Sequence, residues 1–128
     1  GLFAADRNVV MTFHGYPPAV HQLLHGRTAP GRFHIRGFTE VGTTTTPFDM
    51  MVMNGVSRFH LVLEALRRTQ REPDGATSLI AWCLGQLERH AAYIVEHLED
   101  LPEIRDWTWG APLAAAAVPG AADSARLR

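Results

Sequence analysis

The first forty positions alternate between apolar runs and turn-forming residues in a pattern that predicts strand, helix and strand. The run at 8–14, NVVMTFH, has no clean polar face, which is typical of a strand buried on both sides of a parallel sheet. Two prolines then suit the first turn of a helix over 17–25, which a glycine ends. Its expected inward positions are Val20, Leu23 and Leu24. The run at 32–39, RFHIRGFT, predicts a second, half-buried strand, so we expect a right-handed parallel βαβ unit.

The chain beyond position 46 is patterned as helices. Thr46 precedes a proline and has an acidic residue three positions later, which predicts an N-cap for a short helix over 47–54. Ser57 is expected to cap a second helix, which runs to about position 70 with basic residues in its last turn. The sequence EPDG at 72–75 predicts a turn after it.

A long apolar seam predicts the last helix, over 77–100. Its residues are spaced by alternating fours and threes: Ile80, Leu84, Leu87, Ala91, Ile94, Leu98 and Leu101. The helices at 17–25 and 57–70 would cover part of this seam, and some of its apolar surface should stay exposed. Pro102 ends the helix.

The C-terminal positions divide into a packed segment and a tail. The segment EIRDWTW at 103–109 should bury its two indoles, because exposing both would waste a large apolar area. The Ala/Pro/Gly-rich stretch at 110–128 has no periodic pattern and predicts a mobile tail. We therefore expect one domain segment at 1–109.

Two strands are too few for a stable parallel sheet, which needs partners at its edges and cover on both faces. We therefore interpret the βαβ unit as the second half of a doubly wound domain, and we expect this sequence to be part of a larger protein. The apolar strand at 8–14 presents an open edge, so we also expect the isolated chain not to remain a monomer.

Composition narrows the class of protein. A chain of 128 residues fits one domain, and 46% hydrophobic residues exclude wholesale disorder. Twelve basic against thirteen acidic residues leave a formal net charge of −1, so we expect no nucleic-acid partner. No apolar run approaches the length of a membrane span, about 20 residues, and no signal-peptide pattern is present. We expect a soluble, cytoplasmic protein without a membrane partner.

Histidines and the single cysteine offer little reactive chemistry. His21 and His25 have the i, i+4 spacing of two metal ligands on one helix face, but no third ligand stands near them. His90 and His97 are one heptad apart on the last helix, close to Glu88 and Glu96. We expect the two histidines to pair with these glutamates at the surface. Cys83 lies within an apolar helix, where a thiol behaves as a small hydrophobe, and it has no partner for an internal disulfide.

Two segments are the best candidates for binding. Four threonines directly precede the helix at 47–54: Thr43, Thr44, Thr45 and Thr46. Their hydroxyls and the free backbone N–H groups of the helix start could bind an anion. Alternatively, the threonines only cap the helix. His14, Gly15 and Tyr16 follow the first strand, at the end where open α/β sheets bind ligands; alternatively, they only turn the chain. The sequence contains no GxGxxG, no Walker loop and no Gly-Asp-Gly motif.

Four segments carry motifs specific enough to indicate a family. They read FHGYPPAVHQLLHGR (13–27), HIRGFTEVGTTTTPFDMMVMN (34–54), SRFHLVLEAL (57–66) and PEIRDWTW (102–109). In order and with compatible spacing over about 7–109, they closely resemble the C-terminal domain of xylulose-5-phosphate/fructose-6-phosphate phosphoketolases. HGYP, RGFTEVGTTTTPFDM and EIRDW are together highly specific.

The resemblance implies a transketolase-like enzyme with three α/β domains per subunit, assembled as a homodimer or higher oligomer. Such an enzyme uses thiamine diphosphate and Mg²⁺ to cleave xylulose 5-phosphate or fructose 6-phosphate with inorganic phosphate, giving acetyl phosphate and a shorter aldose phosphate. The family's cofactor and proton-transfer groups lie in its first two domains. The resemblance therefore implies no catalytic, cofactor-binding or metal-binding residue in this chain.

What remains for this segment is a structural or interface role against the rest of the phosphoketolase chain. Its expected fold class is α/β, as a partial three-layer α/β/α domain in which helices follow a βαβ unit. Two other functions stay open: a stand-alone helical interaction module built on the seam at 80–101, and a small regulatory domain that binds a phosphorylated metabolite at the threonine run.

Overall fold

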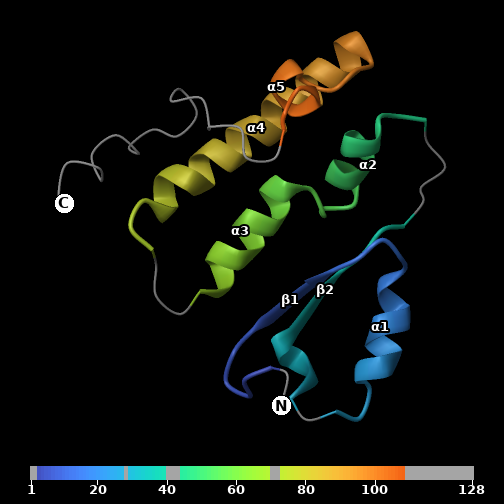
Figure 1. Ribbon diagram of the computed structural model, residues 1–128, viewed down its shortest axis with the longest axis vertical. Coiled ribbons are helices and arrows are strands. Elements are labelled where there is room, and N and C mark those ends of the chain that lie inside the picture. The colour runs from blue at the N-terminus through green and yellow to red at the C-terminus, as the bar shows by residue number, and fades with distance from the viewer. Residues whose placement is uncertain (1–2, 28, 40–43, 70–72, 109–128) are drawn as a thin grey trace.

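The structure is a computed structural model that describes residues 3–27, 29–39, 44–69 and 73–108 (Figure 1). It is a small α/β arrangement with two strands and mostly helical elements. In chain order these are β1 (Val9–Thr12), α1 (Pro17–Leu24), the 3₁₀ turn η1 (Pro30–Arg32), β2 (Phe33–Arg36), α2 (Pro47–Met53), α3 (Arg58–Arg68), α4 (Ala76–His97) and α5 (Pro102–Arg105). The predicted tail at 110–128 lies outside the described residues.

The two strands confirm the predicted parallel pair. β1 and β2 run parallel, with Val9 opposite Phe33 and Thr12 opposite Arg36 at the two ends of the register. α1 connects the strands and packs on β2. Figure 1 shows α1 on one side of the strands, while α3 and α4 lie beyond their other side.

The strand β1 is less buried than its sequence predicts. Val9 and Val10 are half-buried, but Met11 and Thr12 are exposed. Burial on both sides needs neighbours on both faces and a strand at each edge. Among the described residues only β2 pairs with β1, so the prediction was wrong for the chain as it stands. The prediction for β2 was right, because all four of its residues are half-buried.

The inward face predicted for α1 is correct only in part. Val20 and Leu24 are half-buried, but the side chain of Leu23 is 73% exposed. An eight-residue helix on a two-stranded sheet meets too little surface to bury three side chains.

The hydrophobic core lies in the helical half of the molecule. It brings together residues of α2, α3, α4 and α5 with the N-cap residue of α5: Phe48, Phe59, Leu63, Cys83, Ile104 and Leu101. Aromatic rings meet edge to face there, with Phe48 and Phe59 centroids 6.0 Å apart and Phe59 and Trp82 centroids 5.5 Å apart. These contacts fix α2 against α3 and α4.

The buried face of α4 is rotated away from the predicted seam. Its buried residues are Ala76, Cys83, Gln86 and His90. Within the seam, Leu84, Ala91 and Leu98 are exposed. The expectation that some apolar surface stays uncovered is therefore confirmed, but the seam is not the centre of the packed face. The helix ends at His97, because Leu98 adopts a left-handed conformation with φ 56°.

Both predicted caps are confirmed. The Thr46 side chain accepts a hydrogen bond from the Asp49 backbone N–H, and the Ser57 side chain accepts one from the His60 N–H. In the C-terminal segment Trp107 is 43% exposed, so its burial was overestimated, and the Arg58 guanidinium lies 5.1 Å from its ring centroid. Trp109 lies outside the described residues. None of the helices in the described ranges is long and apolar enough to cross a bilayer.

Candidate functional site

The ends of the two strands meet at the HGYP segment. The rings of His14 and Phe38 are stacked, with centroids 4.5 Å apart and planes 18° apart. The Phe38 N–H donates to the Gly15 carbonyl oxygen at 2.9 Å. Because the strands are parallel, the residues that follow them lie at the same edge of the sheet. His14, Gly15 and Tyr16 are thus placed where sequence analysis expected them.

A glycine at position 37 makes this close approach possible. A Cβ on buried Gly37 would lie 2.3 Å from the Gly15 carbonyl oxygen and 2.6 Å from Cδ of Pro17. Neither group can yield without moving backbone. Outside this backbone contact, His14 is exposed and the Tyr16 side chain is 59% exposed. Two aromatic side chains are therefore exposed at this edge of the sheet.

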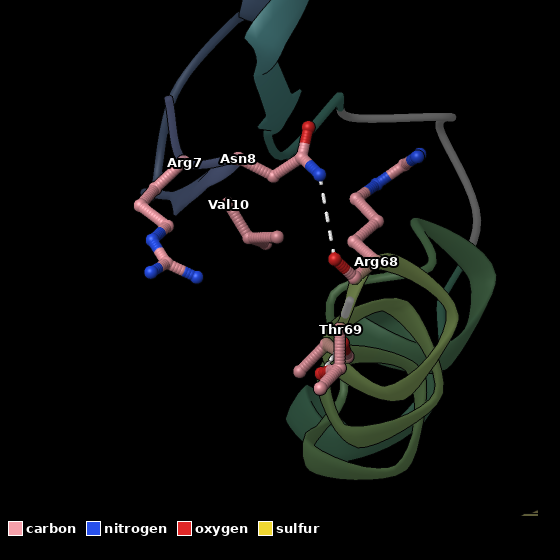
Figure 2. A pocket seen from close by; sticks show the side chains of 6 residues that line it. Arg7, Asn8, Val10, Arg68 and Thr69 are labelled. Atoms are coloured by element: carbon pink, nitrogen blue, oxygen red, sulfur yellow. Dashed lines mark hydrogen bonds between the residues drawn. The ribbon is translucent and has the colours of Figure 1, made fainter. Parts of the chain in front are cut away.

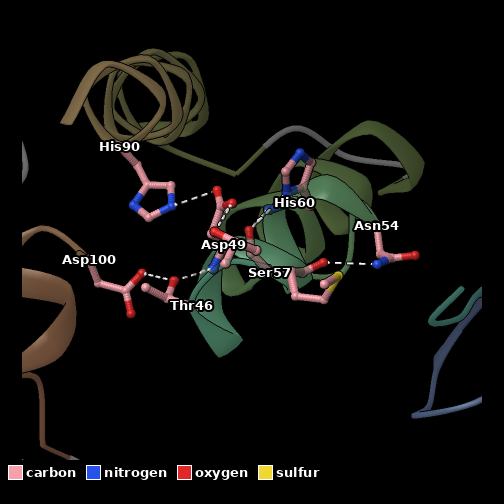
Figure 3. A network of polar contacts seen from close by, with 9 residues as sticks. Thr46, Asp49, Asn54, Ser57, His60, His90 and Asp100 are labelled. Atoms are coloured by element: carbon pink, nitrogen blue, oxygen red, sulfur yellow. Dashed lines mark hydrogen bonds and ion pairs between the residues drawn. The ribbon is translucent and has the colours of Figure 1, made fainter. Parts of the chain in front are cut away.

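The threonine run forms a polar network at the start of α2 (Figure 3). The Thr46 Oγ1 accepts from the Asp49 N–H at 3.1 Å and donates to Asp100 Oδ1 at 2.5 Å. The Thr45 hydroxyl donates to Asp49 Oδ2 at 2.6 Å. Thr44 is exposed, and Thr43 lies outside the described residues. The network joins the start of α2 to the segment that follows α4.

His90 extends this network into the core. Its Nε2 lies 3.1 Å from Asp49 Oδ1, and its side chain is fully buried against the edge of the Phe48 ring. Its Nδ1 has no hydrogen-bond partner within the described structure. The prediction that His90 pairs at the surface was wrong, because its side chain is buried and its Nε2 contacts the Asp49 carboxylate of another helix. His97 does pair at the surface, 3.7 Å from Glu96.

This geometry bears on the two interpretations of the threonine run. The hydroxyls of Thr45 and Thr46 already donate to carboxylates, and the charges of Asp49 and Asp100 make their surroundings negative. An added anion would be repelled by both charges. The contacts favour a role in holding α2 against the end of α4.

A second polar cluster was not foreseen. Glu64, with a side chain only 4% exposed, bonds the guanidinium groups of Arg36 at 2.9 Å and Arg68 at 2.5 Å. Burial by itself would raise the pKa of Glu64, but hydrogen bonds and charge from the two arginines outweigh it and lower the pKa below its ordinary value. This cluster ties β2 to α3. The i, i+4 spacing of Glu64 and Arg68 could have predicted their ion pair from the sequence. Nothing in the sequence indicates that Arg36 contacts Glu64.

An open hollow of about 270 Å³ lies between the chain at the start of β1 and the C-terminal end of α3 (Figure 2). Its lining residues are Arg7, Asn8, Val10, Ala65, Arg68 and Thr69. The Asn8 side-chain amide donates to the Arg68 carbonyl oxygen at 3.3 Å. The Arg68 guanidinium is bound by Glu64, so its charge is already paired within the fold.

The remaining candidate ligands and the single cysteine lie apart in the described part of the chain. His21 and His25 line a shallow hollow with Pro18 and Gln22, and no group of three or more metal-ligating side chains occurs within the described ranges. Cys83 is buried in the core, and burial raises the pKa of its thiol.

Comparisons with known proteins agree with the motifs. The family model of the XFP C-terminal domain matches residues 1–109. A probable phosphoketolase of Brucella abortus is 48% identical over 111 residues, covering 87% of this chain and 14% of that protein. One of Pseudomonas putida is 45% identical over 109 residues, covering 85% and 14%.

A probable phosphoketolase of Bradyrhizobium diazoefficiens is 45% identical over 108 residues, covering 84% of this chain and 14% of its own length. The chain thus spans about one seventh of the curated relatives that it matches. The matched segment includes both the strand-end cluster and the Thr45–Asp49–His90 network. This chain belongs to the XFP C-terminal domain family, the family of the C-terminal domain of phosphoketolase.

Proposed function

We propose that the chain serves as a structural and interface segment of a thiamine-diphosphate-dependent phosphoketolase. That enzyme would cleave xylulose 5-phosphate or fructose 6-phosphate with inorganic phosphate, giving acetyl phosphate and an aldose phosphate. The observation that carries the proposal is the family match over 1–109, together with relatives that are about seven times longer than the matched segment.

The polar side chains of the segment support a structural role. Asp49, Glu64 and His90 are half-buried or buried, and each bonds a side chain from another element. Contacts of this kind hold the elements of the fold together, which supports a structural role for these side chains. The exposed side chains of His14 and Tyr16 instead suit contact with another protein surface.

Within the whole enzyme, we propose an interface role for the seven positions at the strand ends and the threonine run: His14, Gly15, Tyr16, Thr43, Thr44, Thr45 and Thr46. Their partner is the remainder of the phosphoketolase chain or the second subunit of a homodimer or higher oligomer. The complete domain would be a three-layer α/β/α sandwich in a cytoplasmic enzyme. The division into a domain segment at 1–109 and a tail at 110–128 stays a prediction.

Isothermal titration of the chain with thiamine diphosphate and Mg²⁺, and separately with the two sugar phosphates and inorganic phosphate, tests this role. We expect no binding of either class, and no acetyl phosphate from the chain alone. An intact phosphoketolase from a relative serves as the positive control. Cofactor binding in the micromolar range would overturn the structural role. Binding of a sugar phosphate alone would favour the regulatory domain instead, and Thr45→Ala would locate it.

A further inference from the structure

The end of α2 carries a dipeptide, Asn54–Gly55, that the proposed function does not use. Asn54 is the C-cap of α2, and Gly55 turns the chain away from the helix with a left-handed φ of 64°. An asparagine that precedes a glycine is chemically labile, because the glycine has no side chain to keep its backbone nitrogen from attacking the asparagine side chain. The sequence has one other asparagine, Asn8, which precedes the β-branched Val9. Asn54 is therefore the more reactive of the two.

In this reaction, deamidation, the backbone nitrogen of Gly55 attacks Cγ of Asn54. A C–N bond forms between these two atoms, the Gly55 nitrogen loses its proton, and the side-chain amide takes up a proton and leaves as ammonia. The product is a cyclic succinimide. Water then opens the ring at either of its carbonyl carbons, which leaves aspartate or isoaspartate at position 54. The net change consumes water and releases ammonia, with no oxidation or reduction.

The folded chain holds both reacting groups in hydrogen bonds. The Asn54 Oδ1 accepts from the Thr39 backbone N–H at 2.7 Å, and its Nδ2 donates to the Met50 carbonyl oxygen at 2.9 Å (Figure 3). The Gly55 N–H donates to the Val52 carbonyl oxygen at 3.0 Å. The side-chain carbon under attack and the attacking nitrogen are thus both fixed, and neither can approach the other until these contacts open.

The backbone conformation of Asn54 adds to this protection. Ring closure requires the Gly55 nitrogen and the Asn54 Cβ to be nearly eclipsed about the Cα–C bond, because both atoms belong to the same small ring. With ψ at −1°, the Gly55 nitrogen instead eclipses the backbone nitrogen of Asn54 and is turned away from Cβ. The reaction therefore needs rotation about this bond, which would move Gly55 and break its hydrogen bond to Val52.

We propose that Asn54 is a site of spontaneous deamidation, which the folded chain suppresses and which local opening at the end of α2 releases. The proposal goes beyond the proposed function and rests on the contacts of Asn54 and Gly55 alone. Both residues are only half-buried, and helix ends with few buried contacts open locally without unfolding of the rest of the chain. Because hydrogen bonds of both reacting groups must break first, deamidation should be on the order of tenfold or more slower in the folded than in the unfolded chain.

Deamidation would weaken the link between α2 and the strand-end cluster. Asn54 makes that link through Thr39, which directly follows Phe38. A carboxylate at position 54 can still accept from the Thr39 N–H, but it can no longer donate to the Met50 carbonyl oxygen. Its negative charge would also lie at the C-terminal end of a helix, where the helix dipole disfavours an anion. Isoaspartate in addition lengthens the backbone just before the turn at Gly55.

Peptide mapping by mass spectrometry, after timed incubation of the full chain at mildly alkaline pH, tests the site. One sample is folded, as circular dichroism verifies, and the other is unfolded in guanidinium chloride. Trypsin releases Asn54 in the peptide 37–58 and Asn8 in the peptide 8–27, and exchange of an amide for a carboxylate raises the peptide mass. We expect Asn54 to deamidate in the unfolded chain, faster than Asn8, and on the order of tenfold or more slowly in the folded chain. Equal rates at Asn54 in the two samples would overturn the proposal, and so would an unfolded chain in which Asn54 reacts no faster than Asn8.

Substitutions at Thr39 test whether the contacts of Asn54 provide the protection. Thr39→Pro removes the backbone N–H that donates to Asn54, whereas Thr39→Ala keeps it and changes only an exposed side chain. We expect Thr39→Pro to raise the deamidation rate of the folded chain roughly fivefold and Thr39→Ala to leave it unchanged. Guanidinium chloride below the unfolding transition should also leave the rate unchanged, because local opening exposes little surface. A rate that Thr39→Pro does not change, or one that rises steeply with denaturant below the transition, would contradict protection by these contacts.

Discussion

Thr46 joins two parts of the chain through a single hydroxyl, which accepts from the Asp49 N–H and donates to Asp100. Thr46→Ala removes both contacts, and we expect it to lower the free energy of unfolding by about 1–2 kcal/mol. Urea denaturation measures the effect, with the exposed neighbour Thr44→Ala as the control, expected to change stability by less than about 0.5 kcal/mol. Equal midpoints for the two variants would show that the cap carries no stability.

The buried carboxylate of Glu64 predicts a pH-dependent stability. Because its two arginines lower the pKa of Glu64 in the folded state, its contribution is complete above the ordinary value of 4.5. That contribution is lost as the pH falls through the lower pKa of the folded state.

Glu64→Gln should therefore cost about 1–3 kcal/mol at pH 7, a value reduced because both arginines are about one third exposed. The difference from the unsubstituted chain should shrink below pH 4. Chemical denaturation at a series of pH values measures it. Glu96→Gln, at an exposed pair, is the control. A difference that stays constant down to pH 3 would mean that the ion pairs do not set the pKa.

The strand pair depends on one glycine contact. Gly37→Ala places a Cβ against the Gly15 carbonyl oxygen and the Pro17 ring, so we expect a loss of about 1–3 kcal/mol of stability. The heteronuclear NMR signals of residues 13–17 and 36–38 should shift together. Gly31→Ala is the control, since its Cβ would meet no atom within 4 Å. Were both variants equally stable, the close approach of the strand ends would not constrain the fold.

Elements with local signals were predictable, and the rotation of α4 was not. The Thr46 and Ser57 caps and the parallel strands follow from neighbouring residues in the sequence. Hydrophobic periodicity misplaced the packed face of α4, because that face contains the polar residue His90, whose Nε2 contacts Asp49, 41 residues away in the sequence. A buried polar group with a distant partner leaves no periodic trace.

For the molecule as a whole, the sequence was enough to predict the family but only part of the candidate site. Contiguous motifs such as HGYP and EIRDW identified the phosphoketolase C-terminal domain without any knowledge of contacts. The links from Arg36 to Glu64 and from Thr46 to Asp100 depend on the folded chain, which brings together residues 28 and 54 positions apart. The exposed apolar residues of β1 and α4 agree with the proposed role as one segment of a longer phosphoketolase chain.

Acetyl phosphate formation by a chimera tests the central claim most directly. Residues 1–109 of this chain replace the matching segment of the probable phosphoketolase of Pseudomonas putida, and the same protein without that segment is the comparison. If the segment is structural, the chimera forms acetyl phosphate from xylulose 5-phosphate and inorganic phosphate, while the shortened enzyme loses activity together with its stability. A chimera that folds and binds thiamine diphosphate but forms no acetyl phosphate, or a shortened enzyme with full activity, would contradict the account.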